Sequence, residues 1–395
     1  MKVLLIIEGT YPWYRGGVSE WVYQYLAELT HCSFTILQIA TDEFQGLDPQ
    51  QALYPFTDNI SGFIRVKPPE MNGEWDADAK KWYSSLTQKI HAALNDQEII
   101  HVTNTGFAGW LGTQVAHATN LPLVLTEHAI YWKEIEKGAV ALECGYKVPL
   151  QQHRKQAIVQ VFKDMATAVY QQSSKIITVS RSNIPYQRDL GAKHIEYIPN
   201  GIPKSWLNPF NGMGEQPTIG WVGRCAEMKN PLLFFDVVAE LRKSSLQPNY
   251  TMLLSDANEK ELEAQVKQKA IRFPEVQLIW NQNSKEYFPD FDFLMITSHN
   301  ESQPLVMLEA LANAALPAGW QVGDLTSEYG IVVKEGAMVT ELVSAIEQVW
   351  NTPLRYKQRV EERFEFVKDH HLWKDIFSRY QEVFEQLIFQ QTAIH

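Results

Sequence analysis

The sequence predicts an α/β protein made of two Rossmann-like domains, each with a parallel sheet. The chain has 395 residues, of which 45% are hydrophobic, which is enough for two cores. Short apolar runs alternate with amphipathic segments in both halves, as in repeated βαβ units. The segment 198–209 carries three prolines and a glycine and separates the two series. The predicted domains are therefore 1–203 and 204–371, with a final helix at about 372–395 that returns to the first domain.

The first series contains five apolar runs that read as buried strands. Its predicted strands are 3–7, 33–39, 99–103, 123–126 and 175–179, and its predicted helices are about 19–29 and about 150–172. Such runs, alternating with helices, favour a parallel sheet covered on both faces.

The second series repeats this pattern. Its predicted strands are 218–222, 250–254 and 291–297, and its predicted helices are 231–244, 305–315 and about 339–350. The tail from about 372 to 389 is amphipathic and rich in aromatic residues, so it is expected to pack as a helix rather than to extend into solvent.

Charge and cysteine content exclude several classes of protein. The formal net charge of -11 argues against a nucleic-acid partner held through its phosphates. The three cysteines, Cys32, Cys144 and Cys225, lack metal-ligand spacing and are expected to be free thiols in a reducing compartment. No apolar run is long enough to cross a bilayer, and the first residues read as a strand rather than a signal peptide. A cytoplasmic protein is expected, with any membrane contact peripheral.

The segment 297–312 contains two glutamates, Glu301 and Glu309, around a helix start at Pro304. The amides of Leu305 and Val306 would lack intrahelical acceptors, and they could bind a diphosphate beyond the strand end. One carboxylate could then accept hydrogen bonds from ribose and the other from a hexose. Two ordinary solvated glutamates would have the same spacing.

Two cations follow the first strand of the second domain. Arg224 and Lys229 would stand at a carboxyl strand end, where α/β sheets bind ligands, and both suit a diphosphate. A sugar nucleotide reacts by losing its nucleoside diphosphate, whose developing charge needs such stabilisation. Alternatively, Arg224 pairs with a nearby carboxylate and Lys229 is solvated.

The first domain offers two further candidates. Gly17 belongs to a glycine pair after the first strand, and it could let backbone amides approach a phosphate or an acceptor, although a simple tight turn explains the pair equally well. His128 follows a predicted strand and could face the crevice, but a lone histidine is often structural.

These motifs together resemble the retaining glycosyltransferases of family 4, which have the GT-B fold, with two Rossmann-like domains facing across a cleft. The Pel-polysaccharide type of glucosyltransferase is the most similar group. The resemblance rests on residues 8–17, 101–112, 125–128 and 198–201, on Gly223 with Arg224 and Lys229, and on the segment 301–309.

The resemblance also implies roles for single residues. Arg224 and Lys229 would hold the donor diphosphate without a metal ion, and Glu309 would bind ribose. Glu301 would contact the transferred hexose, with His128 beside it, and Gly17 would meet the phosphate or acceptor. No enzymic nucleophile is implied, since the leaving phosphate is thought to help deprotonate the incoming hydroxyl.

Three features depart from the family's pattern. Ser302 replaces the glycine that usually follows the first glutamate. The segment after Pro317 is shortened, which is expected to remove a strand or to remodel the nucleotide site. Residues 255–257 replace a common Gly-Asp-Gly turn. These changes leave the charged residues in place and the identity of the donor open.

The leading hypothesis is a metal-independent retaining glycosyltransferase that uses a nucleotide sugar, UDP-linked rather than GDP-linked, in polysaccharide biosynthesis. Its acceptor would be a glycan or a lipid-linked oligosaccharide. Two alternatives remain: a soluble sugar-metabolising transferase with a small acceptor, and an inactive nucleotide-binding subunit of a polysaccharide synthesis or export complex. The sequence does not indicate an oligomeric state.

Overall fold

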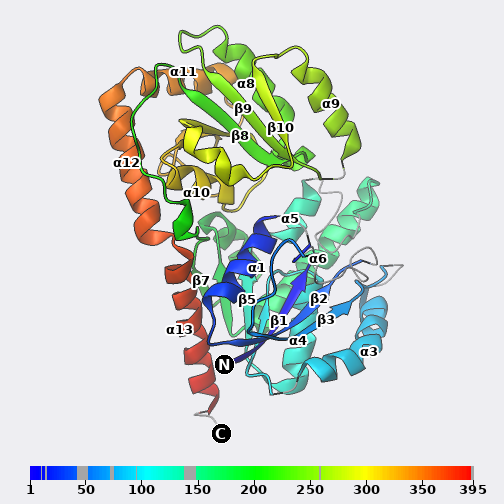
Figure 1. The fold of residues 1–395 in the computed structure, drawn as a ribbon. Coiled ribbons are helices and arrows are strands. Elements are labelled where there is room, and N and C mark those ends of the chain that lie inside the picture. Colours follow the sequence, from blue (N-terminus) through cyan, green and yellow to red (C-terminus); the bar gives the residue numbers. More distant parts are fainter. Residues whose placement is uncertain are drawn as a thin grey trace. The chain divides into compact units, whose positions relative to one another are not determined.

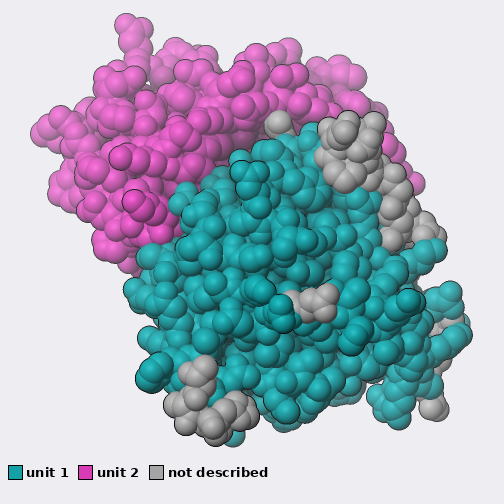
Figure 2. All heavy atoms as spheres, turned by 60° about the horizontal axis from the view of Figure 1, so that its bottom comes forward, with its two compact units in different colours: residues 1–199, 376–395 teal, residues 200–375 magenta. Residues whose placement is uncertain are grey.

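The computed structural model describes residues 1–9, 11–13, 16–41, 52–71, 75–94, 96–137, 148–257 and 259–392. The chain divides into two compact units (Figure 2). Unit 1 comprises Met1–Pro199 and Ile376–His395, and unit 2 comprises Asn200–Asp375. The chain thus crosses between units four residues away from each of the predicted boundaries at 203/204 and 371/372.

Unit 1 is built on a seven-stranded sheet whose order is β3-β2-β1-β4-β5-β6-β7. All of its strand pairs are parallel. The strands are β1 (Lys2–Glu8), β2 (Ser33–Ile39), β3 (Ile60–Val66), β4 (Ile99–Val102), β5 (Leu123–Glu127), β6 (Lys175–Thr178) and β7 (Ile195–Tyr197). The carboxyl ends of these strands meet at one edge, so residues that follow them gather there.

Helices cover both faces of this sheet, because its strands are apolar on both sides. The helices of unit 1 are α1 (Gly17–Glu28), α3 (Trp75–Ala93), α4 (Phe107–Thr119), α5 (Tyr131–Glu136), α6 (Gln152–Gln172), α7 (Ile184–Asp189) and the greater part of α13 (Trp373–Thr392). Side chains of α3, α4 and α6 form one core with Leu4, Ile6 and Val102.

The helix α13 packs on unit 1 together with α1 (Figure 1). Tyr25 and Trp21 of α1 contact the rings of Phe377 and Tyr380. His101, on β4, lies 2.8 Å from the Tyr25 hydroxyl through Nδ1 and 2.8 Å from Thr126 Oγ1 through Nε2. Burial lowers the pKa of His101 to about 3, so the ring is neutral and bridges α1 to β5. The predicted return of the final helix to the first domain is observed.

Unit 2 is built on a six-stranded sheet of order β10-β9-β8-β11-β12-β13, again with parallel pairs. The strands are β8 (Thr218–Arg224), β9 (Asn249–Ser255), β10 (Val276–Trp280), β11 (Phe293–Ile296), β12 (Leu316–Trp320) and β13 (Ile331–Val333). The expectation that the shortened segment after Pro317 removes a strand is wrong, because both β12 and β13 form. Pro317 itself lies inside β12.

The helices of unit 2 also lie on both faces of the sheet. They are α8 (Pro231–Leu241), α9 (Lys260–Ala270), α10 (Leu305–Ala312), α11 (Val339–Trp350) and α12 (Pro353–His370). Side chains of α8 and α11 share one core with Trp221, Met252 and Met295. Those of α10 share the other with Leu253 and Leu294. Neighbouring residues of a strand therefore serve opposite cores.

The described residues bear on the expected free thiols and on the expected lack of a membrane-spanning helix. Cys32 and Cys225 are buried free thiols, as predicted, while Cys144 lies outside the described residues. No helix in the described part of the chain is both long and apolar enough to span a bilayer.

Candidate active site

The candidate diphosphate site begins where β11 ends and α10 starts. Pro304 is the N-cap of α10 with φ -63°, the value that its ring enforces. The Met307 amide already bonds to the Pro304 carbonyl, at 3.1 Å. The amides of Leu305 and Val306 have no acceptor among the described residues, so they can receive an anion.

The structure brings Lys229 and Glu301 together in unit 2. Lys229 Nζ lies 2.5 Å from Glu301 Oε1, and the side chains are 26% and 12% exposed. The alternative in which Lys229 is merely solvated is therefore wrong. Because both groups are partly accessible, the pair can open to a ligand that offers phosphate to the lysine and hydroxyls to the glutamate.

Thr297 fixes the position of the Lys229 segment. Its buried hydroxyl accepts a hydrogen bond from Trp221 Nε1 at 2.9 Å and faces the carbonyl oxygens of Lys229 and Asn230, each at 2.9 Å. A further bond, 2.9 Å long, joins the His299 amide to the Met228 carbonyl. The loop after β8 is thus tied to the end of β11. Sequence reasoning missed Thr297, although a threonine at the end of a predicted strand is a signal of this kind.

Arg224 is the last residue of β8 and is exposed. Its guanidinium makes no ion pair with another described residue, so the alternative in which it pairs with a nearby carboxylate is not observed. The next amide, that of Cys225, bonds to the Ser255 carbonyl at 2.8 Å and keeps the backbone in the sheet. A rigid strand end therefore carries a cation that can take an external anion.

The turn after β12 lies directly under the Glu301 loop. Gly323 has φ +54°, and a Cβ there would lie 2.1 Å from the Ser302 carbonyl oxygen and 2.5 Å from that of Glu301. The neighbouring Asp324 amide bonds to the Ser302 carbonyl at 2.7 Å. Ser302 is not in the left-handed region, so a serine in place of glycine imposes no backbone strain. The loop shape depends on Gly323 instead.

Glu309 projects from α10, one turn beyond the open amides. It is half-buried, and about 6 Å of helix rise separates it from Leu305. Its carbonyl accepts a bond from Asn313 Nδ2 at 2.9 Å, which secures the short helix at its C-terminal end. This placement matches the predicted strand, loop and helix arrangement.

The two candidates of the first domain both belong to unit 1. Gly17 is exposed and is the first residue of α1, with Gly16 as an extended N-cap, so the glycine pair lies at the start of a helix. The preceding Tyr14 and Arg15 lie outside the described residues.

His128 follows β5 and contacts Trp21, with ring centroids 4.8 Å apart in a T-shaped arrangement. Burial lowers the pKa of His128 to about 3, so its ring is neutral. The residue is half-buried as a whole, but its Nε2 is buried and has no hydrogen-bond partner among the described residues. A neutral imidazole with one unused nitrogen can bond to a hydroxyl.

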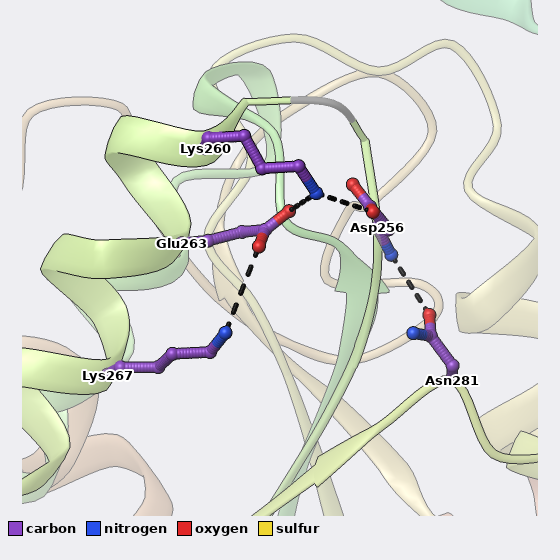
Figure 3. Close-up of polar contacts among 5 residues, drawn as sticks. All are labelled: Asp256, Lys260, Glu263, Lys267 and Asn281. Atoms are coloured by element: carbon purple, nitrogen blue, oxygen red, sulfur yellow. Dashed lines mark hydrogen bonds and ion pairs between the residues drawn. The ribbon is translucent and has the colours of Figure 1, made fainter.

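Charged side chains fix the loop that replaces the Gly-Asp-Gly turn (Figure 3). Lys260 Nζ bridges Asp256 Oδ2 at 2.7 Å and Glu263 Oε1 at 2.9 Å. Lys267 approaches Glu263 from the other side at 3.9 Å. Asn281 Oδ1 accepts a bond from the Asp256 amide at 3.1 Å and joins the ends of β9 and β10. Side-chain bonds therefore shape this strand edge.

Among the described residues, no group of three or more His, Cys, Asp and Glu side chains is arranged to hold a metal ion. The groups at the candidate site that can face an anion are instead two cationic side chains and two backbone amides.

Two family models match the chain, and the boundary between the two units, at 199/200, falls between the matched segments. Residues 216–352 match the family described as "Glycosyl transferases group 1". Residues 1–68 and 74–194 match a domain of unknown function, DUF3492. No curated protein matches the chain by sequence.

Several solved structures resemble the chain over nearly its whole length. A sucrose-phosphate synthase from Thermosynechococcus elongatus has a TM-score of 0.74 at 17% identity, covering 99% of this chain and 100% of that one. Anabaena HepE, solved with UDP-glucose, has a TM-score of 0.71 at 14% identity, covering 97% and 99%. WaaG, a glycosyltransferase involved in lipopolysaccharide biosynthesis, has a TM-score of 0.67 at 13% identity, covering 97% and 99%.

These findings establish the fold of the chain and a family match for part of unit 2. The two parallel-sheet units have the GT-B architecture, which confirms the predicted fold class. The second half of the chain carries a glycosyltransferase group 1 domain, and the candidate residues of unit 2 all lie within it.

Proposed function

We propose that this protein is a retaining glycosyltransferase that transfers a hexose from a UDP-linked sugar to a glycan or lipid-linked acceptor in polysaccharide biosynthesis. The group 1 domain supports transfer chemistry. HepE was solved with UDP-glucose, and WaaG acts in lipopolysaccharide biosynthesis, which favours this class of donor and pathway. The motifs of family 4 and of the Pel type agree with it.

The observation that carries the proposal is the arrangement at the adjacent strands β8 and β11 in unit 2. Arg224 is the last residue of β8, and Lys229 follows it. Glu301 and the open amides of Leu305 and Val306 follow β11, which pairs with β8. Cations and amides stabilise a diphosphate, and a carboxylate beside them binds sugar hydroxyls. Such a site can bind both the diphosphate and the sugar of a sugar nucleotide.

We propose the following reaction at this site. The bond between the anomeric carbon and the β-phosphate oxygen breaks, and the diphosphate leaves with the electron pair. Lys229, Arg224 and the two amides stabilise the charge that develops on it. The acceptor oxygen bonds to the anomeric carbon on the same face, and its proton passes to the leaving phosphate. The resemblance to family 4 gives Glu301 and His128 contacts with the hexose, Glu309 a contact with ribose, and Gly17 a contact with phosphate or acceptor.

This chemistry requires no metal ion, because two side-chain cations and two amide dipoles supply the positive charge. We further propose that the enzyme acts in the cytoplasm, at the inner face of the membrane when its acceptor is lipid-linked.

The test is release of UDP from UDP-glucose and other UDP-sugars, with glycan, lipid-linked and monosaccharide acceptors in parallel. Lys229→Met is expected to abolish transfer. Lys243→Met, which removes an exposed lysine paired with Glu240, is the matched control and should not. Transfer at the wild-type rate by Lys229→Met would contradict the site. Transfer only to free monosaccharides would favour the small-acceptor enzyme, and nucleotide binding without turnover would favour the inactive subunit.

A further inference from the structure

Both segments by which the chain passes between the units are joined to each other within unit 2. The Ile202 amide donates to the His371 carbonyl at 2.6 Å, and the Trp373 amide donates to the Ile202 carbonyl at 3.2 Å. His371 Nδ1 also donates to the Asn200 carbonyl, at 2.8 Å. The incoming segment at 200–202 and the outgoing segment at 371–373 therefore form one hydrogen-bonded unit, which we call the crossing pair.

The crossing pair is bonded to the candidate donor loop at Gln303. Its Oε1 accepts from the Asn200 backbone amide at 2.6 Å, and its own carbonyl accepts from Asn200 Nδ2 at 3.3 Å. Its Nε2 donates to Asp324 Oδ2 at 3.2 Å. Gln303, Asn200 and Asp324 are each at least 94% buried, so water cannot readily replace these bonds.

Gln303 lies between the residues assigned to the donor. Glu301 precedes it by two positions, and the open amides of Leu305 and Val306 follow it. Asp324, whose carboxylate accepts a hydrogen bond from Gln303, also donates its backbone amide to the Ser302 carbonyl at 2.7 Å. A shift of the donor loop must therefore break buried hydrogen bonds or move the Asn200 backbone with it.

We propose that Gln303 is a positioning residue that couples occupancy of the donor loop to the order of the crossing pair. This inference rests on the proposed donor site. A nucleotide sugar that fixes the loop strengthens the Gln303 bonds and protects the Asn200 amide. By linkage, weakening those bonds lowers nucleotide affinity. Gln303 need not touch the donor, and a purely structural role would leave the amide's protection independent of nucleotide.

The test uses hydrogen exchange of the full chain, resolved at the amides of Asn200 and Ile202, with and without UDP, GDP or ADP. Gln303→Met keeps the side-chain length and removes both the acceptor and the donor. Gln303→Glu keeps the acceptor for the Asn200 amide and loses the donor to Asp324. Gln358→Met, at an exposed position of α12, is the control for glutamine replacement.

In wild type and in Gln358→Met, we expect the binding nucleotide to slow exchange of the Asn200 amide. In Gln303→Met without nucleotide, we expect the Asn200 amide to exchange about threefold to tenfold faster than in wild type, the range for the loss of one hydrogen bond. We expect nucleotide binding not to slow this exchange in Gln303→Met. Gln303→Glu should keep the slow exchange of the Asn200 amide, but it should bind nucleotide more weakly than wild type because it lacks the donor to Asp324.

Two results overturn the inference. The first is an exchange rate of the Asn200 amide that, without nucleotide, is the same in Gln303→Met as in wild type. The second is an exchange rate of this amide in wild type that does not change when nucleotide binds, and this measurement does not depend on the folding of a variant. If no nucleotide binds the wild-type protein, the proposed function fails, and the exchange rates without nucleotide still decide whether Gln303 orders the crossing pair.

Discussion

Replacing Gly323 by alanine tests whether the turn after β12 sets the shape of the donor loop. The added Cβ would stand 2.1 Å from the Ser302 carbonyl oxygen and 2.5 Å from the Glu301 carbonyl oxygen. Neither atom belongs to a flexible side chain, so relief requires movement of the backbone that carries Glu301. The left-handed φ of +54° adds strain for any residue with a Cβ.

The size of the effect follows from these distances. Ordinary carbon–oxygen contacts begin at about 3.3 Å, so the two backbones must separate by about 1.2 Å. A misplacement of about 1 Å at a reacting centre can reduce the rate about a hundredfold. We therefore expect Gly323→Ala to lower kcat/KM for the donor by about two orders of magnitude.

Gly336→Ala provides the matched control. Gly336 has φ +80°, and no atom lies within 4 Å of the position that a Cβ would take. Alanine there should therefore cost about 1–2 kcal/mol of stability for the left-handed conformation, but it causes no clash. The assay is UDP release at several donor concentrations, with circular dichroism and thermal melting to verify folding. Equal activity of the two variants would refute the reasoning.

Three further changes have distinct expected outcomes. Thr297→Val leaves the buried Trp221 Nε1 without an acceptor, so urea unfolding should show a loss of about 1–3 kcal/mol, and calorimetry should show weaker UDP binding. Glu301→Gln releases Lys229 for phosphate, so UDP affinity should rise about two- to fivefold while transfer falls; a parallel fall of both would contradict the pairing. Burial raises the pKa of Glu127 from 4.5 to about 7, so the contribution of its extra proton to stability is lost as pH rises through these values, opposite in sign to the contributions of His101 and His128. The free energy of unfolding of the wild type minus that of Glu127→Gln should therefore fall by on the order of 3 kcal/mol in urea unfolding measured from pH 4.5 to pH 7.

Much of the fold could be predicted because the strands are continuous apolar runs. The strand Ser33–Ile39 and the helix Val339–Trp350 were predicted at their observed bounds, since apolar residues make up most of the strand and recur at helical spacing in the helix. Helix α12 was missed because charged residues dominate it, although Tyr356, Val360, Phe364 and Val367 recur at helical spacing and are buried. Helix α10 ends three residues before its predicted end, since Ala314 adopts a left-handed conformation that leads into β12.

The positions of the candidate residues at strand ends could be predicted, but their contacts could not. Arg224, Lys229 and Glu301 were proposed because they stand at or after the carboxyl ends of predicted strands. The Lys229–Glu301 pair joins residues 72 positions apart, and no local pattern indicates which carboxylate a lysine will meet. The same holds for Gly323 under the Glu301 loop and for Gln303 on Asn200, because both contacts join segments that no local sequence pattern relates.

Calorimetric comparison of UDP with UMP tests most directly whether Lys229 and Arg224 hold a nucleotide's terminal phosphate, as we propose. The two ligands differ only by that phosphate. We expect the wild-type protein to bind UDP more tightly than UMP, and we expect this difference to disappear when Lys229→Met and Arg224→Met are combined. Equal affinity for the two ligands in wild type, or an undiminished preference for UDP in the double variant, would contradict it.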